Sequence, residues 1–237
     1  MHHIQNKEEY KIAEYCKKML ELEIAKLPDE YYYTSVPLCV IDSVFSIGVR
    51  YEGVKNTVAR YCDYFNLNKY RIGTEHPILS EQQSVEQFIN SFNELGLDTY
   101  VQNVFQNRQR TSTRNGILKA EAVYNFCNIL QKYDVNYLQD VNKLYDNKEF
   151  ETEIKAIQGQ KSGISLVYFY MLVGDDNWVK PDRMIIRFLE NVLERKVKIN
   201  EAQSLLQLTS EILINEFSHI TPRLLDYQIW NYVRSNA

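Results

Sequence analysis

The sequence has few of the residues that build metal sites, disulfide frameworks and membrane spans. Its 237 residues include only four cysteines, Cys16, Cys39, Cys62 and Cys127, which are widely spaced and lie beside apolar residues. They form neither a Cys-x-x-Cys metal pair nor a small disulfide framework, so we expect buried, reduced thiols. No apolar run approaches the roughly 18 uninterrupted residues that a membrane span needs, and we expect no membrane partner.

Signals for export and for β-structure are also missing. The first residues, MHHIQNKEEYK, lack the apolar core of a signal peptide, so we expect a cytoplasmic protein, associated with the nucleoid if the source is bacterial. No alternation of apolar and polar residues lasts beyond a few positions, and the 8 glycines fall mostly at joints. This pattern predicts an all-α fold. With 45% apolar and 24% charged residues, we expect one globular unit over residues 1–237, and a monomer.

An excess of positive charge is absent too, since the net charge is −4 at pH 7. This disfavours nucleic acid as a partner, because binding phosphate requires local lysine and arginine. The charges are unevenly distributed, however. Between residues 103 and 120 the sequence has Arg108, Arg110, Arg114 and Lys119 and no acidic residue. A basic loop on an acidic protein can still steer DNA to one face.

Several helices and helix starts can be predicted from local patterns. Residues 8–25 have apolar positions at helical spacing. Ser84 with a glutamine three positions later predicts a capping box, and Thr221 before Pro222 predicts an N-cap followed by proline at the first helical position. Residues 36–46 are apolar on nearly all sides, as in a buried helix. Asp42 within this helix needs a partner, and we expect a cap or an ion pair.

The most informative segment runs from residue 157 to residue 188. Gly159 and Gly163 bound a tight turn, because glycine adopts positive φ, or allows another backbone to approach, at little cost. An apolar helix follows and stops at Gly174. We then place Pro181 at the first position of the next helix and Asp182 in its first turn, where unpaired N–H groups favour a carboxylate. Spacing alone favours a helix cap and ordinary helix packing.

Three segments, taken in order, resemble a known family. Residues 157–159, Ile-Gln-Gly, stand where the family has the Leu-Pro-Gly of its hairpin, and residues 181–187 keep the five-residue step from Asp to Arg of its Val-Asp-Thr-His-x-x-Arg motif. Residues 38–46 are similar to its apolar helix before Leu-Ser-x-Gln, and residues 119–121 to its Tyr-x-x-Lys-Ala helix. The family is the helix-hairpin-helix DNA glycosylase superfamily, which includes endonuclease III and the 3-methyladenine glycosylases.

The resemblance implies an architecture of two helical lobes. Residues 45–178 would form one lobe that ends in the hairpin, and residues 1–44 with 179–237 would form the other. The turn at residues 157–163 would lie at the mouth of a cleft and bind double-stranded DNA. The hairpin would present backbone N–H groups, and carbonyls that can hold a monovalent cation, to a DNA phosphate.

The resemblance also implies a reaction, which is hydrolysis of the N-glycosidic bond of a damaged or modified base. Asp182 matches the catalytic carboxylate of the family. Lys161 occupies the second glycine position of the hairpin, and Gly163 stands where bifunctional members have a Schiff-base lysine, so a monofunctional enzyme without lyase activity is expected. No cysteine follows Cys127, so we expect no iron–sulfur cluster and no other cofactor.

The candidate DNA contacts combine the hairpin, the basic loop and a turn near Gly48. Gly48 stands at the glutamine with which family members fill the space of the extruded base. The neighbouring Arg50 and Tyr51 are candidates for the wedge or for phosphate contact, with surface packing as the equal alternative. The complete set of candidate DNA-binding residues is Gly159, Lys161, Gly163, Arg50, Tyr51, Arg110, Arg114, Lys180 and Arg187.

Two functions from other classes compete with this interpretation. The first is a non-catalytic helix-hairpin-helix module that binds DNA or senses its structure, which retains the hairpin and does not require Asp182. The second is a helical protein–protein interaction domain, which the acidic net charge favours. Salt-sensitive DNA binding would distinguish the glycosylase and the DNA-binding module from the protein–protein interaction domain. Base release that depends on Asp182 would distinguish the glycosylase from the DNA-binding module.

Overall fold

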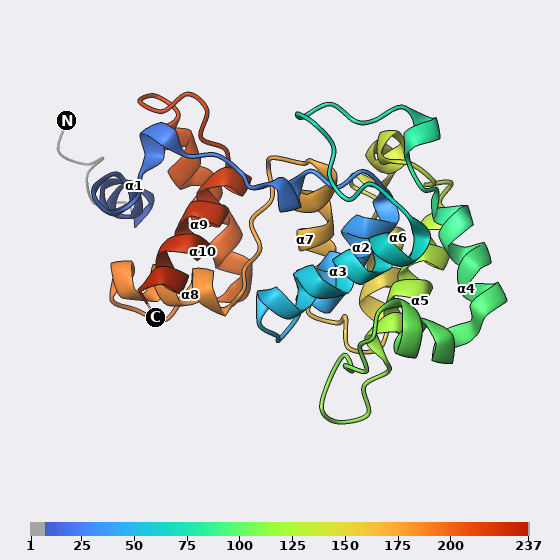
Figure 1. The fold of residues 1–237 in the computed structure, drawn as a ribbon. Coiled ribbons are helices and arrows are strands. Elements are labelled where there is room, and N and C mark those ends of the chain that lie inside the picture. The colour runs from blue at the N-terminus through green and yellow to red at the C-terminus, as the bar shows by residue number, and fades with distance from the viewer. Residues whose placement is uncertain (1–7, 237) are drawn as a thin grey trace. The chain divides into compact units, whose positions relative to one another are not determined.

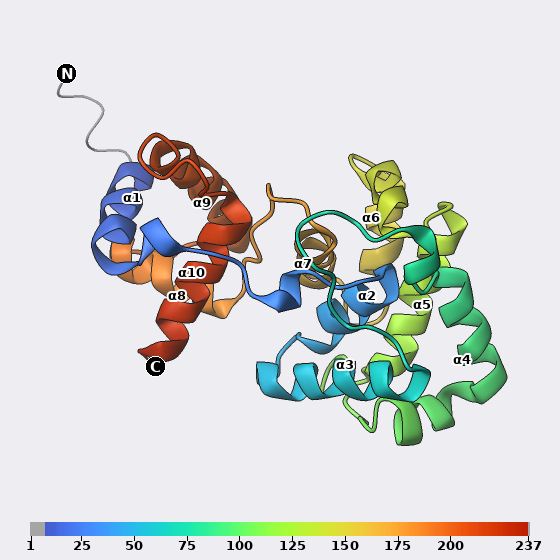
Figure 2. The ribbon, with the colours of Figure 1, turned by 45° about the horizontal axis from the view of Figure 1, so that its top comes forward.

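The computed structural model describes residues 8–236, and Figures 1 and 2 show its ribbon. These residues form ten α-helices joined by loops and short helical turns. In this range no β-strand forms, and the only β-pairings are two isolated bridges, Tyr33 with Tyr70 and Arg110 with Leu118. The predicted all-α fold is therefore confirmed.

The chain is divided into two compact units. We call residues 29–174 the central unit, and residues 8–28 with 175–236 the terminal unit. The helices of the central unit are α2 (Val36–Phe45), α3 (Tyr51–Phe65), α4 (Val85–Thr99), α5 (Lys119–Lys132), α6 (Lys148–Ala156) and α7 (Ile164–Val173). Those of the terminal unit are α1 (Glu8–Met19), α8 (Arg183–Leu193), α9 (Ile199–Leu213) and α10 (Pro222–Ser235).

The two units meet at residues 28/29 and 174/175. Both boundaries fall earlier in the chain than those implied by the family resemblance, which lie at residues 44/45 and 178/179. The first differs because α2 packs against α5 and α7 of the central unit. The second differs because Gly174 ends α7 and Asp176 already binds the terminal unit, where its carbonyl accepts the Arg223 N–H at 3.1 Å. The helix over residues 36–45 is thus the centre of the unit that contains the hairpin.

Two apolar helices form the core of the central unit. Every residue of α2 is buried, and α7 buries all but two of its ten residues, Ile164 and Val167. A helix that is apolar on all sides must be surrounded by protein, and α2 is covered by α3, α5 and α7. The hairpin therefore leads directly into a buried helix, which fixes its position in this unit.

Lys119 belongs to this core and not to the surface of the basic loop. Its side chain is 2% exposed, and Nζ donates to the carbonyls of Phe45 and Ile47, at 2.8 Å each. These carbonyls lie at the end of α2, where unpaired acceptors and the helix dipole favour a cation. Lys119 therefore joins the start of α5 to the end of α2 and leaves the exposed charge of the loop to three arginines.

The four cysteines are free and buried, as predicted. Burial raises the pKa of the Cys39 and Cys62 thiols to about 12, which keeps both protonated at neutral pH. Burial raises the pKa of Cys16 and Cys127 as well. All four therefore act as small apolar core residues.

In the terminal unit the first helix packs against two of the last three helices. α1 contacts α8 and α9, and α10 contacts both of these, so segments distant in sequence lie side by side (Figure 1). Their apolar faces form one core that includes Ile12, Ile185, Leu206 and Ile229. The helix predicted over residues 8–25 ends earlier, at Met19, and a 3-10 turn at 22–24 follows.

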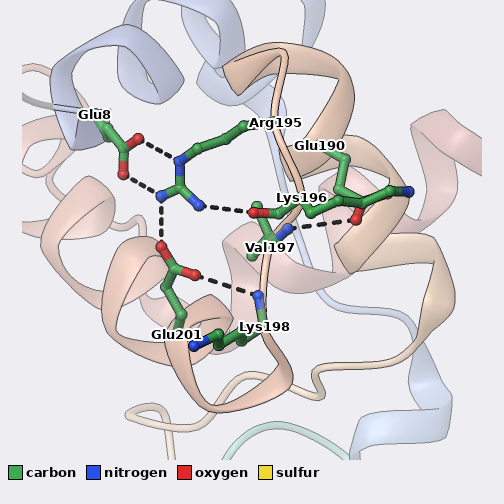
Figure 3. A network of polar contacts seen from close by, with 7 residues as sticks. All are labelled: Glu8, Glu190, Arg195, Lys196, Val197, Lys198 and Glu201. Atoms are coloured by element: carbon green, nitrogen blue, oxygen red, sulfur yellow. Dashed lines mark hydrogen bonds and ion pairs between the residues drawn. The ribbon is translucent and has the colours of Figure 1, made fainter.

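Arg195, in the loop between α8 and α9, ties three parts of the terminal unit together (Figure 3). Its Nε donates to Glu8 Oε1 at 2.6 Å, and its Nη2 contacts both Glu8 and Glu201. The guanidinium lowers the pKa of both carboxyls, chiefly through these hydrogen bonds. The network is partly exposed to solvent, so we expect it to orient the starts of α1 and α9 more than to stabilise the fold.

The predicted caps at Ser84 and Thr221 are confirmed. The Ser84 hydroxyl accepts the Gln87 N–H at 3.0 Å, and the Gln87 side chain accepts the Ser84 N–H at 2.8 Å, which completes a capping box. The Thr221 hydroxyl accepts the Leu224 N–H at 3.1 Å, with Pro222 as the first helical residue. Local sequence therefore fixed both helix starts.

Candidate functional site

The turn between α6 and α7 has the backbone that its glycines predicted. Gly159 has φ of 88° and Gly163 has φ of 72°, both in the left-handed region that favours glycine. The Gln160 N–H donates to the Ile157 carbonyl and the Gly163 N–H donates to the Gln160 carbonyl, at 2.9 Å each. Gly163 is also the N-cap of α7. We refer to residues 157–163 as the hairpin.

The hairpin lies directly against the loop that contains the arginines. A Cβ placed on Gly159 would come closer than 3.0 Å to both side-chain atoms Cβ and Oγ1 of Thr111. The Gln158 side chain donates a hydrogen bond to the Asn115 carbonyl. Gly159 is therefore required twice, by its φ and by the approach of Thr111. Two segments more than forty residues apart, each proposed to contact DNA, meet at this point.

The basic loop, residues 108–118, is held in a defined shape by its own hydrogen bonds. The Thr111 N–H donates to the Ile117 carbonyl at 2.9 Å, and the Arg110 guanidinium donates to the Gly116 carbonyl at 2.7 Å. Arg108, Arg110 and Arg114 are exposed residues. The loop thus presents positive charge beside the hairpin, where Lys161 is also exposed.

An open hollow of about 520 Å³ lies over the end of α6 and the hairpin. It contains two lysines, and Lys155 is paired with Glu151 at 2.8 Å, whereas Lys161 has no acidic partner among the described residues. The lining residues are Thr152, Lys155, Ala156, Ile157, Gln158, Gly159 and Lys161. A concave surface with an unpaired lysine and exposed backbone has the features of an anion-binding site, such as a site for a phosphate group.

The turn after α2 separates the two wedge candidates. Arg50 is exposed at the start of α3. The Tyr51 hydroxyl instead points inward and donates to Asp42 Oδ2 at 3.0 Å, beside the Tyr33 hydroxyl, which donates to the same oxygen at 2.9 Å. Burial, and then the charge of Asp42, raise the pKa of Tyr51 well above its ordinary value. Arg50 and Gly48 are therefore the exposed residues of this turn.

Asp42 is the buried carboxylate that the sequence marked as needing partners. Its side chain is fully buried, and two tyrosine hydroxyls donate to one of its oxygens. These hydrogen bonds replace the solvation that burial removes. The predicted partner was a cap or an ion pair, and the partners include neutral phenols because α2 is surrounded by aromatic residues.

Asp182 is the N-cap of α8. Its Oδ1 accepts the N–H groups of Met184 at 2.8 Å and Ile185 at 3.2 Å, and the residue is partly exposed. Among residues 8–236, Oδ2 of Asp182 accepts no hydrogen bond. The carboxylate therefore has one oxygen committed to the helix and one that remains an acceptor. Its only hydrogen bonds are to its own helix.

Pro181 is not the first helical residue, so that prediction is wrong. The helix begins at Arg183, and the Asp182 N–H donates to the Lys180 carbonyl at 2.7 Å around Pro181. This is a three-residue turn, whose central residue needs the φ near −75° that proline supplies. Asp182 takes the capping position because its carboxylate satisfies two unpaired N–H groups, which proline could not do.

The predicted site residues fall into two sets. The hairpin glycines, Lys161, Arg50, Tyr51, Arg110 and Arg114 belong to the central unit, and the hairpin and the basic loop are in contact there. Asp182, Lys180 and Arg187 belong to the terminal unit, where Arg187 is exposed one turn after the cap. Asp182 and the DNA-contact candidates of the hairpin and the basic loop thus belong to different units.

Sequence reasoning missed Asp226, which lies on the buried face of α10. It is 4% exposed, and its Oδ1 accepts the Lys180 N–H at 3.0 Å. Burial raises the pKa of Asp226 well above its ordinary value, and the charge of Asp182 raises it further. A signal was present in the sequence, because Asp226 follows Leu224 and Leu225 and precedes Ile229, all on the core face.

Within residues 8–236 no group of three or more His, Cys, Asp or Glu side chains is placed to hold a metal ion. In the same range no helix has the length and apolar character required to cross a membrane.

Comparison with known proteins assigns the chain to a family. Residues 10–234 match the model of a family described as a domain of unknown function, DUF8548, and the chain therefore belongs to that family. No curated protein matches the chain, and no solved structure matches it. The family match covers both compact units.

Proposed function

We propose that this protein is a monofunctional DNA glycosylase that hydrolyses the N-glycosidic bond of a damaged or modified base in double-stranded DNA. The observation that carries the proposal is the packing of the family-like segments on one another. α2 contacts both α5 and α7, and Lys119 at the start of α5 caps the end of α2. The hairpin that leads into α7 touches the basic loop.

In this proposal the hairpin and the basic loop hold the DNA backbone. The exposed Lys161, Arg110 and Arg114 supply charge for phosphates beside the exposed Gly159 of the hairpin. Contacts of this kind position the duplex without reading its sequence. The target base must then leave the stack, because its glycosidic bond is out of reach inside the duplex.

Asp182 would stabilise the transition state. The C1′–N bond breaks with its electron pair leaving on the base, and positive charge develops on the sugar. A fixed carboxylate favours this charge and orients a water, whose oxygen bonds to C1′ as its proton is released. Oδ2 of Asp182 is available for this work, and the helix bonds to Oδ1 hold the group rigid. Gly163 offers no amine, so the product is an abasic site.

A non-catalytic DNA-binding module is the second candidate, and one observation favours it. Asp182 makes both hydrogen bonds of an ordinary N-cap, which is sufficient reason for an aspartate at this position. Such a module would use the same hairpin and basic loop.

The experiment that separates the two is base release by the Asp182→Asn variant. Duplexes that contain a panel of damaged or modified bases are incubated with protein and then treated with alkali, which cleaves at abasic sites. We expect strand breaks only after alkali, and a loss on the order of a hundredfold or more in rate for the variant, as for other preorganised groups. Asparagine can still accept the two helix N–H groups, so folding should persist.

Glu194→Gln is the matched control, because it removes one carboxylate from the exposed end of the same helix. The control should release base at the parental rate. Equal rates for the parent and Asp182→Asn would identify Asp182 as a cap only, and breaks without alkali would contradict the monofunctional mechanism.

A further inference from the structure

Two aspartates in the terminal unit bond the backbone N–H and the backbone carbonyl of the same residue, Lys180. The Lys180 N–H donates to Asp226 Oδ1 at 3.0 Å, and the Lys180 carbonyl accepts the Asp182 N–H at 2.7 Å. Asp226 comes from α10, and Asp182 begins α8. The turn that carries the Asp182 carboxylate is therefore held by a hydrogen bond to a second carboxyl group, that of Asp226 on α10.

We propose that Asp226 is a positioning residue for Asp182: it acts as a neutral carboxylic acid that holds the Lys180–Asp182 turn, so that Asp182 alone carries the charge of the pair. The expected effect of Asp226 on catalysis rests on the proposed glycosylase function. The protonation of Asp226 and its hydrogen bond to the turn are independent of that function.

The surroundings of Asp226 are poor ones for a carboxylate anion. The residue is 4% exposed, and among residues 8–236 its side chain has one hydrogen bond, from a neutral N–H group. A buried anion normally requires several donors or a counter-charge. A neutral acid needs less, because one acceptor position on Oδ1 satisfies the Lys180 N–H while the proton stays on the carboxyl group.

The charged groups that act on Asp226 come from two elements besides its own helix. Asp182, at the start of α8, raises the pKa of Asp226, and Lys180, in the preceding loop, lowers it by less than burial and Asp182 raise it. On α10 itself, Arg223 lies one turn earlier and binds Asp176, with Nη2 at 2.8 Å from Oδ1. Within the described part of the chain, Lys180 is the cation that offsets the effect of Asp182 on the pKa of Asp226.

The Asp226 carboxyl holds the backbone of the turn that carries Asp182, so its protonation sets the charge beside that turn. As pH rises through the raised pKa of Asp226, a second negative charge forms beneath the turn. That charge gains solvation when the turn moves away from α10, and this movement displaces Asp182. Base release should therefore fall on the alkaline side as Asp226 loses its proton.

Linkage gives the sign of the effect on stability. The folded state holds a proton on Asp226 that the unfolded chain releases near pH 3.8, so this contribution to stability is full below that pH. It is lost as pH rises through the folded pKa. Asparagine has no proton to lose, so Asp226→Asn should be more stable than the parent at alkaline pH, and their difference should grow with pH.

The first test needs no substrate. Carboxyl carbon NMR of aspartate-labelled protein, with Asp226→Asn to assign the signal, should show Asp226 titrating well above the ordinary aspartate range. In Asp182→Asn the same signal should titrate at lower pH, because the neighbouring charge is gone. The proposal would be overturned if Asp226 titrated at the ordinary aspartate pKa, or if its pKa were the same in the parent and in Asp182→Asn. Either result would hold regardless of whether the protein is a glycosylase.

The second test follows base release against pH. Asp226→Asn keeps an acceptor for the Lys180 N–H and stays neutral, so its activity should persist to higher pH than that of the parent. Asp226→Leu removes the acceptor and should lower the rate at every pH. An alkaline limb shared by parent and Asp226→Asn would overturn the positioning role. Absence of base release from any duplex would reject the glycosylase proposal, and the NMR titration would still decide the state of Asp226.

Discussion

At residue 159 the hairpin backbone passes over Thr111, and no side chain fits between the two. The position has φ of 88°, so an L-residue there would be strained even in open space. The Thr111 hydroxyl is buried beneath the hairpin, and no hydrogen-bond partner is found for it among the described residues. This contact and the hydrogen bond from Gln158 to the Asn115 carbonyl place the hairpin against the basic loop.

Gly159→Ala should therefore lower the free energy of unfolding by about 2 kcal/mol or more. Forced overpacking typically costs about 1–3 kcal/mol, and a positive φ adds to that cost. Urea unfolding followed by circular dichroism measures the change. Gly53→Ala is the matched control, because Gly53 lies in α3 with nothing within 4 Å of an added Cβ. The control should gain up to about 1 kcal/mol from helix propensity. Equal urea midpoints of unfolding for Gly159→Ala and the parent would show that Thr111 can move to accommodate the added methyl group at no cost in stability.

The two aspartates show what a residue-by-residue interpretation can and cannot reach. Asp182 could be placed at a helix start from sequence, because Pro181 and the following apolar periodicity mark the region. Whether the proline or the aspartate occupies the cap depends on which one satisfies the N–H groups of Met184 and Ile185. Burial and the charge of Asp182 raise the pKa of Asp226, and no local pattern predicts that tertiary neighbour.

At the scale of elements, the hairpin and the basic loop act as one charged surface. Arg110 is committed in part to the loop itself, since it donates to the Gly116 carbonyl. Arg114 and Lys161 are exposed, and changing them leaves that bond intact. Lys119 is excluded from this surface because it caps α2. The exposed charge available to DNA is thus smaller than the sequence count, but it lies beside the hairpin.

Lys161→Glu combined with Arg114→Glu should weaken binding to all duplexes alike, because phosphate contacts carry no sequence information. The steepness with which affinity falls with salt should also decrease, by about two units for two lost phosphate contacts. Fluorescence anisotropy with unrelated duplexes measures both effects. Lys18→Glu with Lys26→Glu is the control, since it makes the same change in net charge on exposed lysines of the terminal unit. Equal weakening by the control pair would show that only net charge matters.

For the whole molecule, the sequence predicted the fold class, two of the helix starts and the state of the cysteines. It did not predict the unit boundaries. The family resemblance places residues 36–44 with the terminal helices, whereas the apolar surface of the helix that contains them is covered by α5 and α7. The second segment of the terminal unit begins at residue 175, next to the ion pair between Asp176 and Arg223, which are far apart in the sequence. Pairings of this kind are set by tertiary packing, which local periodicity does not determine.

An acidic chain can bind DNA only through a segregated patch, and this gives the last prediction. In the proposed function the net charge of −4 would repel the duplex as a whole, while the exposed charge of the hairpin and the basic loop would attract it locally. The logarithm of the affinity should therefore fall linearly with the logarithm of salt concentration, by about 0.9 for each phosphate that is neutralised. Anisotropy titrations from low to physiological salt measure this slope. An absence of binding at low salt would favour the protein–protein interaction domain, because a patch that holds phosphates is strongest when screening is weakest.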